Sequence, residues 1–311
     1  MIHPSTLSAG RRCGPASLSG RTRASPGVAM TSETMSAKVS TSCWCGTLTR
    51  WTVDALPVVL LPGIVLPAEL AYGDLVTALG KDVQTIVKEL DIYRDDAPPA
   101  DYSLDTEVAG VLREADARGW SRFHLVGYSA GGAAALAFAA RQPARLLSLA
   151  LLEPAWAGDW DWTGEQRRLW AKYDELDQVS AEQYLPAFMK LQVRPEVQLP
   201  PPPAGPPPPW MSKRPAGIRT IMRTFRTYHL DREALAAFDR PVYFALGGLS
   251  NPDQYGEVAK RLASVFGDFT LEVFADRHHF DPPHRIEPER LATSLRGVWA
   301  RAGETAAQRD R

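Results

Sequence analysis

The pentapeptide GYSAG at residues 127–131 has a G-x-S-x-G pattern, and its serine could act in catalysis. It follows an apolar, strand-like run at 123–126 and precedes a helix-like run of small residues at 130–141. A strand that becomes a helix within so few residues strains the backbone at the serine, and the flanking glycines leave room for the turn. The pattern therefore predicts that Ser129 is held at the tip of a strand as a nucleophile; the structural alternative is a serine that caps the helix.

A serine hydroxyl is a poor nucleophile unless a base takes its proton, and the base needs a partner that fixes its tautomer. Three of the six histidines, His278, His279 and His284, cluster after the last strand-like segment. The loop after that strand lies at the same edge of a parallel sheet as the serine. We expect His279 to be the base, with His278 as the alternative, and His284 to cap a helix or pair with nearby acids.

The elements that must position these residues alternate along the chain. Short apolar runs typical of buried parallel strands alternate with segments whose apolar residues repeat with helical spacing. Such alternation predicts an α/β fold, with a mostly parallel central sheet and helices on both faces. The expected strands are 57–62, 83–90, 122–127, 146–152, 241–246 and 269–274, and the expected helices are 104–115, 130–141, 255–266 and 288–299.

The order of these residues resembles the α/β-hydrolase superfamily, whose members place a serine in this turn, an acid further on, and a histidine after the last strand. The resemblance covers about residues 55 to 300. It implies that the loop Leu61-Pro62-Gly63-Ile64 is the oxyanion loop, although Pro62 stands where the family usually has histidine. The backbone N–H groups of Ile64 and Ala130 would then form the oxyanion hole.

The same resemblance leaves two candidates for the acid of the triad. Most members carry it after the strand equivalent to 241–246, where this chain has Ser250 and Asn251, with Asp253 two or three residues late. A minority branch takes its acid from the end of the strand that follows the serine helix, which is Glu153 here. An acid at the carboxyl end of a strand lies on the catalytic edge of the sheet. We favour Glu153, with Asp253 as the alternative.

Residues 155–238 interrupt the alternation with helical patterns and a proline-rich run at 200–209. We interpret this stretch as an inserted helical cap with a stiff polyproline connector, between core segments 41–154 and 239–311. We expect Tyr128, next to the serine, and Trp156, at the start of the cap, to contact substrate. Residues 1–40 are rich in Ser, Arg, Gly and Pro, and we expect a disordered tail.

Composition excludes several classes of function. The 311 residues carry 35 basic and 36 acidic side chains, which argues against nucleic-acid binding and against a polybasic membrane anchor. There is no apolar run long enough to span a membrane. Three cysteines do not make a disulfide framework, which favours a cytoplasmic protein. The sequence has no phosphate-binding loop, dinucleotide fingerprint or metal-ligand spacing, so it implies no cofactor.

These observations predict a cofactor-free serine hydrolase that cleaves a small apolar ester-like molecule through an acyl-enzyme, with no nucleic-acid or membrane partner. A serine nucleophile disfavours dehalogenation and epoxide hydrolysis, which use a carboxylate nucleophile on this fold. The nearest alternatives are a C–C bond hydrolase or lactonase, and a non-catalytic ligand-binding protein on the same scaffold.

Overall fold

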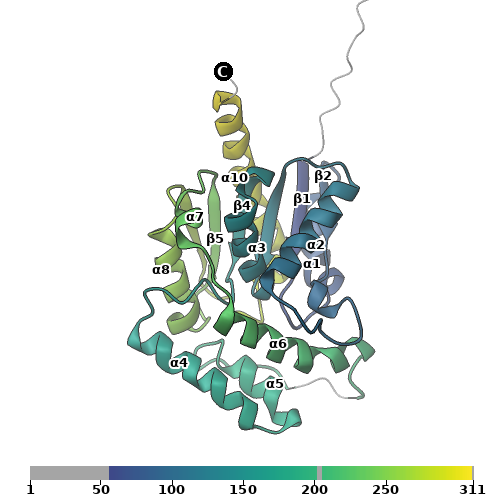
Figure 1. Ribbon diagram of the computed structural model, residues 1–311, viewed down its shortest axis with the longest axis vertical. Helices are drawn as coiled ribbons and strands as arrows, with labels where there is room; N and C mark the ends of the chain where they lie inside the picture. Colours follow the sequence, from purple (N-terminus) through teal and green to yellow (C-terminus); the bar gives the residue numbers. More distant parts are fainter. Residues whose placement is uncertain (1–55, 202–204, 310–311) are drawn as a thin grey trace, which may run out of the picture. The chain divides into compact units, whose positions relative to one another are not determined.

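The computed structural model describes residues 56–201 and 205–309. Six parallel strands form one sheet in the order β2-β1-β3-β4-β5-β6 (Figure 1). This arrangement confirms the predicted α/β fold with a parallel central sheet. The strands are β1 Leu56–Leu61, β2 Val83–Val87, β3 Phe123–Tyr128, β4 Leu146–Leu152, β5 Val242–Gly247 and β6 Phe269–Phe274.

Helices cover both faces of this sheet, because the strands are apolar on both sides. Val59 and Leu61 belong to a buried cluster with helices α2, α3 and α8, whereas Val58 and Leu60 belong to a second cluster with α1 and α10. Alternate side chains of a strand point to opposite faces, so a continuous apolar run is what a doubly covered sheet requires. These helices are α1 Ala68–Leu79, α2 Leu104–Ala117, α3 Ala130–Arg141, α8 Glu257–Ala263 and α10 Pro288–Arg309.

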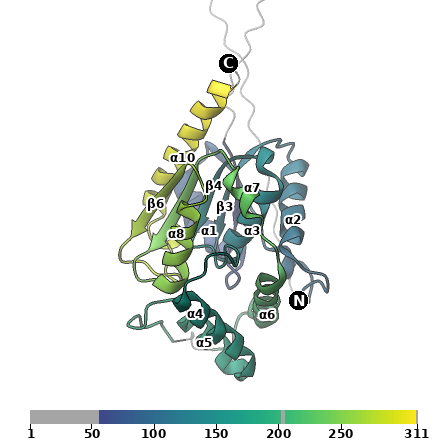
Figure 2. The ribbon, with the colours of Figure 1, turned by 60° about the vertical axis from the view of Figure 1, so that its left-hand side comes forward.

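The segment between β4 and β5 is helical, as expected for the cap. Helices α4, α5 and α6 lie across one end of the sheet in both ribbon views (Figures 1 and 2). The side chains of Thr163 and Ser180 accept backbone N–H groups at the starts of α4 and α5, which explains why these helices begin there. The helices of this segment are α4 Gly164–Glu175, α5 Ala181–Lys190, α6 Arg214–Thr227 and α7 Arg232–Ala236.

Some elements differ from the sequence-based expectation. Helix α1 was not predicted; it contains a glycine and β-branched residues, and packing against α10 and the short helix α9, Pro283–Ile286, supports it. The expected helix 255–266 is preceded by a π-helical turn, Pro252–Gly256, and α8 begins only at Glu257.

Two predictions concern segments that lie wholly or partly outside the described residues. The expected tail, residues 1–40, lies outside the described residues, as do 202–204 in the proline-rich run. Pro208, in the described part of that run, has the polyproline II dihedral angles φ −62° and ψ 151°. Within the described ranges, none of the helices has the length and apolar character needed to cross a membrane.

Candidate active site

Ser129 lies at a strained turn between β3 and α3. Its backbone has φ 54° and ψ −117°, a region that residues other than glycine rarely adopt. The turn is possible because the flanking glycines allow very close backbone contacts. A Cβ atom on Gly127 would lie 2.4 Å from the Gly131 carbonyl oxygen, and a Cβ on Gly131 would lie 2.4 Å from the Leu61 carbonyl oxygen. The strained backbone holds the Ser129 side chain at the carboxyl end of β3.

The structure brings Ser129, His279 and Glu153 together in one hydrogen-bonded chain. Ser129 Oγ lies 2.9 Å from His279 Nε2, and His279 Nδ1 lies 3.0 Å from Glu153 Oε2. All three residues are at least 95% buried. An ionised carboxylate can only accept hydrogen bonds, so Nδ1 carries the imidazole proton and Nε2 accepts the Ser129 O–H. This is the arrangement in which a histidine can take a proton from serine.

Of the two candidate acids, Glu153 is hydrogen-bonded to His279 and Asp253 is not. Glu153 follows β4 with a positive φ of 46°, and its Oε1 accepts the Gly247 N–H at 2.7 Å. Its carboxylate is therefore oriented by a backbone donor on one side and by the imidazole on the other. Asp253 is exposed at the π-helical turn, where its own N–H donates to the Asn251 side chain.

The expected oxyanion loop, residues 61–64, is held against the serine turn. The Gly131 N–H donates to the Pro62 carbonyl at 2.9 Å, and the Tyr93 hydroxyl donates to the Ile64 carbonyl at 2.8 Å. The backbone N–H groups of Ile64 and Ala130 have no hydrogen-bond partner within the described part of the chain. These two groups are thus available to donate to a bound oxygen atom.

Ser129 and His279 line a cavity of about 160 Å³ between the oxyanion loop, the loop after β6 and helix α5. Its walls are mostly apolar and include Ile64, Phe188 and Met189. Tyr128, expected to contact substrate, also lines this cavity, and its hydroxyl donates to the His279 carbonyl oxygen. Burial raises the pKa of Tyr128 well above its usual value, so it stays a neutral donor.

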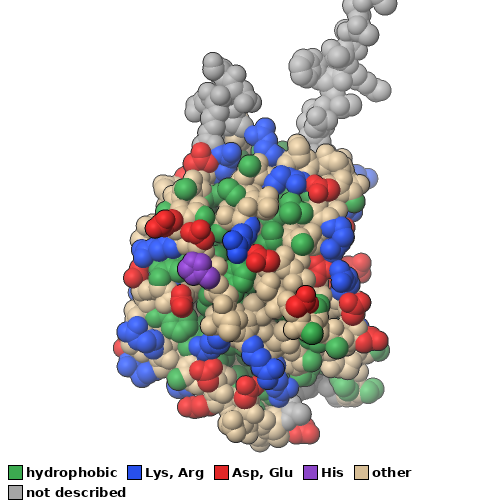
Figure 3. All heavy atoms as spheres, in the orientation of Figure 1, with side chains coloured by type: hydrophobic (Ala, Val, Ile, Leu, Met, Phe, Trp, Pro, Cys, Tyr) green, Lys and Arg blue, Asp and Glu red, His purple; other side chains and the backbone are tan. Residues whose placement is uncertain are grey.

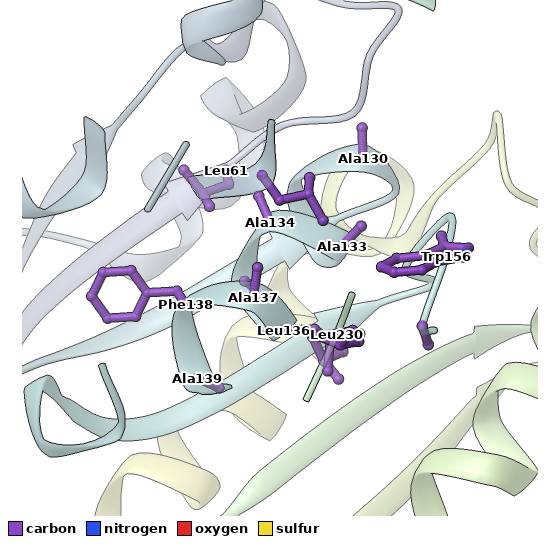
Figure 4. Close-up of a cluster of buried hydrophobic side chains, with 14 of the residues drawn as sticks. Leu61, Ala130, Ala133, Ala134, Leu136, Ala137, Phe138, Ala139, Trp156 and Leu230 are labelled. Carbon is purple, nitrogen blue, oxygen red and sulfur yellow. The ribbon is translucent and has the colours of Figure 1, made fainter. Parts of the chain in front are cut away.

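The structure does not support the expectation that Trp156 contacts substrate. Its side chain is 1% exposed and does not line the cavity. The indole stacks on Phe225 of α6, with ring centroids 5.4 Å apart, and Figure 4 shows it among the buried side chains around α3. Burial of this large apolar side chain joins the cap to the core, so Trp156 has a packing role.

The other candidate histidines have different environments. The His278 Nδ1 accepts the Phe280 N–H at 3.2 Å, and burial lowers its pKa. His284 was expected to cap a helix or pair with acids, and it does neither. It is fully buried between the rings of Tyr72 and Tyr128, and neither ring nitrogen has a partner among the described residues.

Sequence reasoning missed one contact to the candidate base. Tyr255, in the π-helical turn after β5, stacks on the His279 imidazole with centroids 4.3 Å apart and planes 15° from parallel. Its hydroxyl donates to Gln192 Oε1 at 2.7 Å, and Gln192 lines the cavity from the cap side. No spacing in the sequence relates Tyr255 to His279, because the contact joins two loops that follow different strands.

Within the described ranges, no three His, Cys, Asp or Glu side chains are grouped so that they could hold a metal ion. The candidate site thus consists of the three hydrogen-bonded side chains, the small cavity and the two backbone N–H groups that have no partner among the described residues.

The family comparison agrees with this architecture. A family model described as the alpha/beta hydrolase fold matches residues 92–282, more than half of the chain, so the chain belongs to that family. The resemblance inferred from the sequence is confirmed, and membership supports a hydrolase. No curated protein matches the sequence.

Solved structures resemble the chain at low sequence identity. A bacterial membrane phospholipase A aligns with a TM-score of 0.61 and 19% identity, over 79% of each chain. A carboxylesterase from Bacillus subtilis aligns with a TM-score of 0.52 and 18% identity, over 79% of this chain and 84% of its own. A proline iminopeptidase from Mycobacterium smegmatis aligns with a TM-score of 0.53 and 19% identity, over 81% and 92%. These likenesses establish the shared fold.

Proposed function

We propose that this protein is a serine hydrolase that cleaves a small ester-like substrate through an acyl-enzyme. The observation that carries the proposal is the hydrogen-bonded chain from Ser129 through His279 to Glu153, which ends at a cavity. A structural serine in a glycine-rich turn needs neither a strained backbone nor a buried histidine oriented by a carboxylate.

The proposed reaction starts when His279 Nε2 takes the Ser129 proton and Oγ attacks the carbonyl carbon of the substrate. Negative charge then develops on the carbonyl oxygen, and the N–H groups of Ile64 and Ala130 stabilise it. Loss of one such donor costs roughly 3–4 kcal/mol of transition-state stabilisation in serine hydrolases. The imidazolium returns the proton to the leaving group, and a water activated by His279 then hydrolyses the acyl-enzyme.

The dimensions of the cavity support a small substrate. A volume of about 160 Å³ is similar to the roughly 150 Å³ apolar cavity that accepts a benzene ring in an engineered protein. The walls favour an apolar acyl or alcohol group near the reacting carbonyl, with the cap residues Phe188 and Met189 on one side. We propose that this part of the cap contributes to substrate selection.

The surface charge supports a small molecule rather than a nucleic acid as the partner. Acidic and basic side chains are interspersed on the face shown in Figure 3. The net charge is −1, whereas a phosphate-binding surface requires clustered basic residues. The cytoplasmic location expected from the cysteines remains a prediction, since all three lie outside the described residues.

The test is labelling with a fluorophosphonate, which reacts with serines activated by a base. We expect the wild type to be labelled and Ser129→Ala to be unlabelled. Ser212→Ala is the matched control, because Ser212 is an exposed cap serine. If the folded wild type is not labelled, or if Ser129→Ala is labelled equally, the proposal fails and a ligand-binding protein becomes the better interpretation.

A further inference from the structure

One residue that lines the cavity next to Ser129 is charged, and no described residue pairs with it. Arg285, in the short helix α9, lines the cavity, and no aspartate or glutamate lies among the lining residues. Within the described ranges, its guanidinium forms no ion pair and no side-chain hydrogen bond. The cavity therefore has an uncompensated positive charge in a mostly apolar wall.

Among the arginines whose side chains are described, Arg285 is the only partly buried one that lacks both a side-chain hydrogen bond and an ion pair. Three others also lack both, and all three, Arg122, Arg167 and Arg223, are exposed to solvent. Arg285 is partly buried. Water solvates the exposed guanidinium groups, but a partly buried one without a counter-ion loses part of its hydration without an ion pair to compensate.

The neighbouring residues hold Arg285 at the cavity. Its backbone N–H donates to the Pro282 carbonyl at 3.0 Å, and the preceding His284 is fixed between two tyrosine rings. Burial, together with the nearby charge of Arg285, lowers the pKa of His284 to about 3. His284 is thus neutral near pH 7, and Arg285 is the one arginine or lysine among the residues that line the cavity.

We propose that the substrate carries one carboxylate, which Arg285 binds, on an otherwise apolar body. A guanidinium pairs with a carboxylate through parallel N–H···O bonds, and one unpaired cation balances one negative charge. The substrate class is then a small monoanionic ester, such as the half-ester of a dicarboxylic acid. This inference rests on the serine hydrolase function proposed above and adds the chemical group that the site selects.

The experiment compares two esters that differ only in charge: monomethyl glutarate, and the methyl ester of glutaric acid monoamide. A charge-assisted hydrogen bond is worth enough to make kcat/KM about tenfold to a hundredfold higher for the half-ester in the wild type. In Arg285→Met, which keeps the apolar stem, we expect the ratio of the two kcat/KM values to fall to about one. Arg223→Met is the matched control, because it removes an exposed, unpaired arginine of the cap, and it should keep the wild-type ratio.

Binding to the inactive protein separates this inference from the proposed function. Calorimetry should detect monomethyl glutarate binding to Ser129→Ala and at least tenfold weaker binding to Ser129→Ala with Arg285→Met. If fluorophosphonate labelling fails while this difference in binding persists, the hydrolase proposal is wrong and the carboxylate site stands. Equal kcat/KM values for the two esters in the wild type, a preference that survives Arg285→Met, or half-ester binding to Ser129→Ala that Arg285→Met leaves unchanged would overturn the assignment of Arg285.

Discussion

The substitution Glu153→Gln tests the assignment of the acid most sharply, because the surrounding hydrogen bonds dictate how the new amide must lie. The Gly247 N–H donates to Glu153 Oε1 at 2.7 Å, so the amide oxygen of glutamine must face Gly247. The amide NH₂ group then faces His279 Nδ1, where the carboxylate oxygen was 3.0 Å away. A donor at that place forces Nδ1 to accept and leaves the imidazole proton on Nε2.

An imidazole with its proton on Nε2 donates toward Ser129 and has no lone pair to take the serine proton. A comparable aspartate-to-asparagine change in a serine protease lowers kcat by roughly 10⁴ through this reversal of the tautomer. That factor corresponds to about 5 kcal/mol of transition-state stabilisation. We therefore expect the second-order rate constant for fluorophosphonate labelling to fall by about 10⁴ in Glu153→Gln.

The control is Asp253→Asn, which removes the other candidate acid. Asp253 is exposed and is not bonded to His279, so this variant should label at the wild-type rate. Circular dichroism and thermal melting verify that both variants are folded. A Glu153→Gln rate within tenfold of wild type, or an equally large loss in Asp253→Asn, would refute the assignment.

Three further predictions follow from the strained turn, the stacked tyrosine and the buried histidines. Ser129→Gly and Ser129→Ala should both abolish labelling, and the glycine variant should have the higher free energy of unfolding, by about 1 kcal/mol in urea titrations, because both lose the hydroxyl and only glycine adopts the φ of 54° without strain. A glycine variant less stable than the alanine variant would contradict the strained turn. Tyr255→Leu, which removes the stacking on the imidazole, should slow labelling more than Tyr255→Phe, which loses only the hydrogen bond to Gln192. Equal rates in the two variants would assign no positioning role to the stack. Burial lowers the pKa of His124 and of His284 to about 3, so the unfolded chain binds protons that the folded protein does not bind between that value and the ordinary pKa of 6.5. The free energy of unfolding should therefore decrease as the pH is lowered through this window, by about 2 kcal/mol per histidine from pH 7 to pH 5. In chemical denaturation, His284→Gln should show a correspondingly smaller decrease.

The sequence by itself determined the fold class and the position of the serine. Buried strands such as 146–152 are continuous apolar runs, and the glycines around Ser129 are required by one tight turn. Both signals are local, because burial on two faces and close backbone contact restrict residue types at consecutive positions. The chain also limited the candidate base to the histidines at 278, 279 and 284, since a loop after the last parallel strand must lie at the same edge as the serine, but the hydrogen bonds that single out His279 are tertiary contacts.

Only the tertiary structure shows that Glu153 rather than Asp253 is hydrogen-bonded to His279, because both acids follow parallel strands at the same edge of the sheet. The decision depends on the Gly247 N–H and on the direction of one carboxylate, and neither has a sequence pattern. The burial of Trp156 and the stacking of Tyr255 on His279 likewise arise between segments far apart in the chain. Periodicity shows which face of an element is apolar, but the partner of that face is set by three-dimensional packing, and the cavity next to Ser129 is a product of that packing.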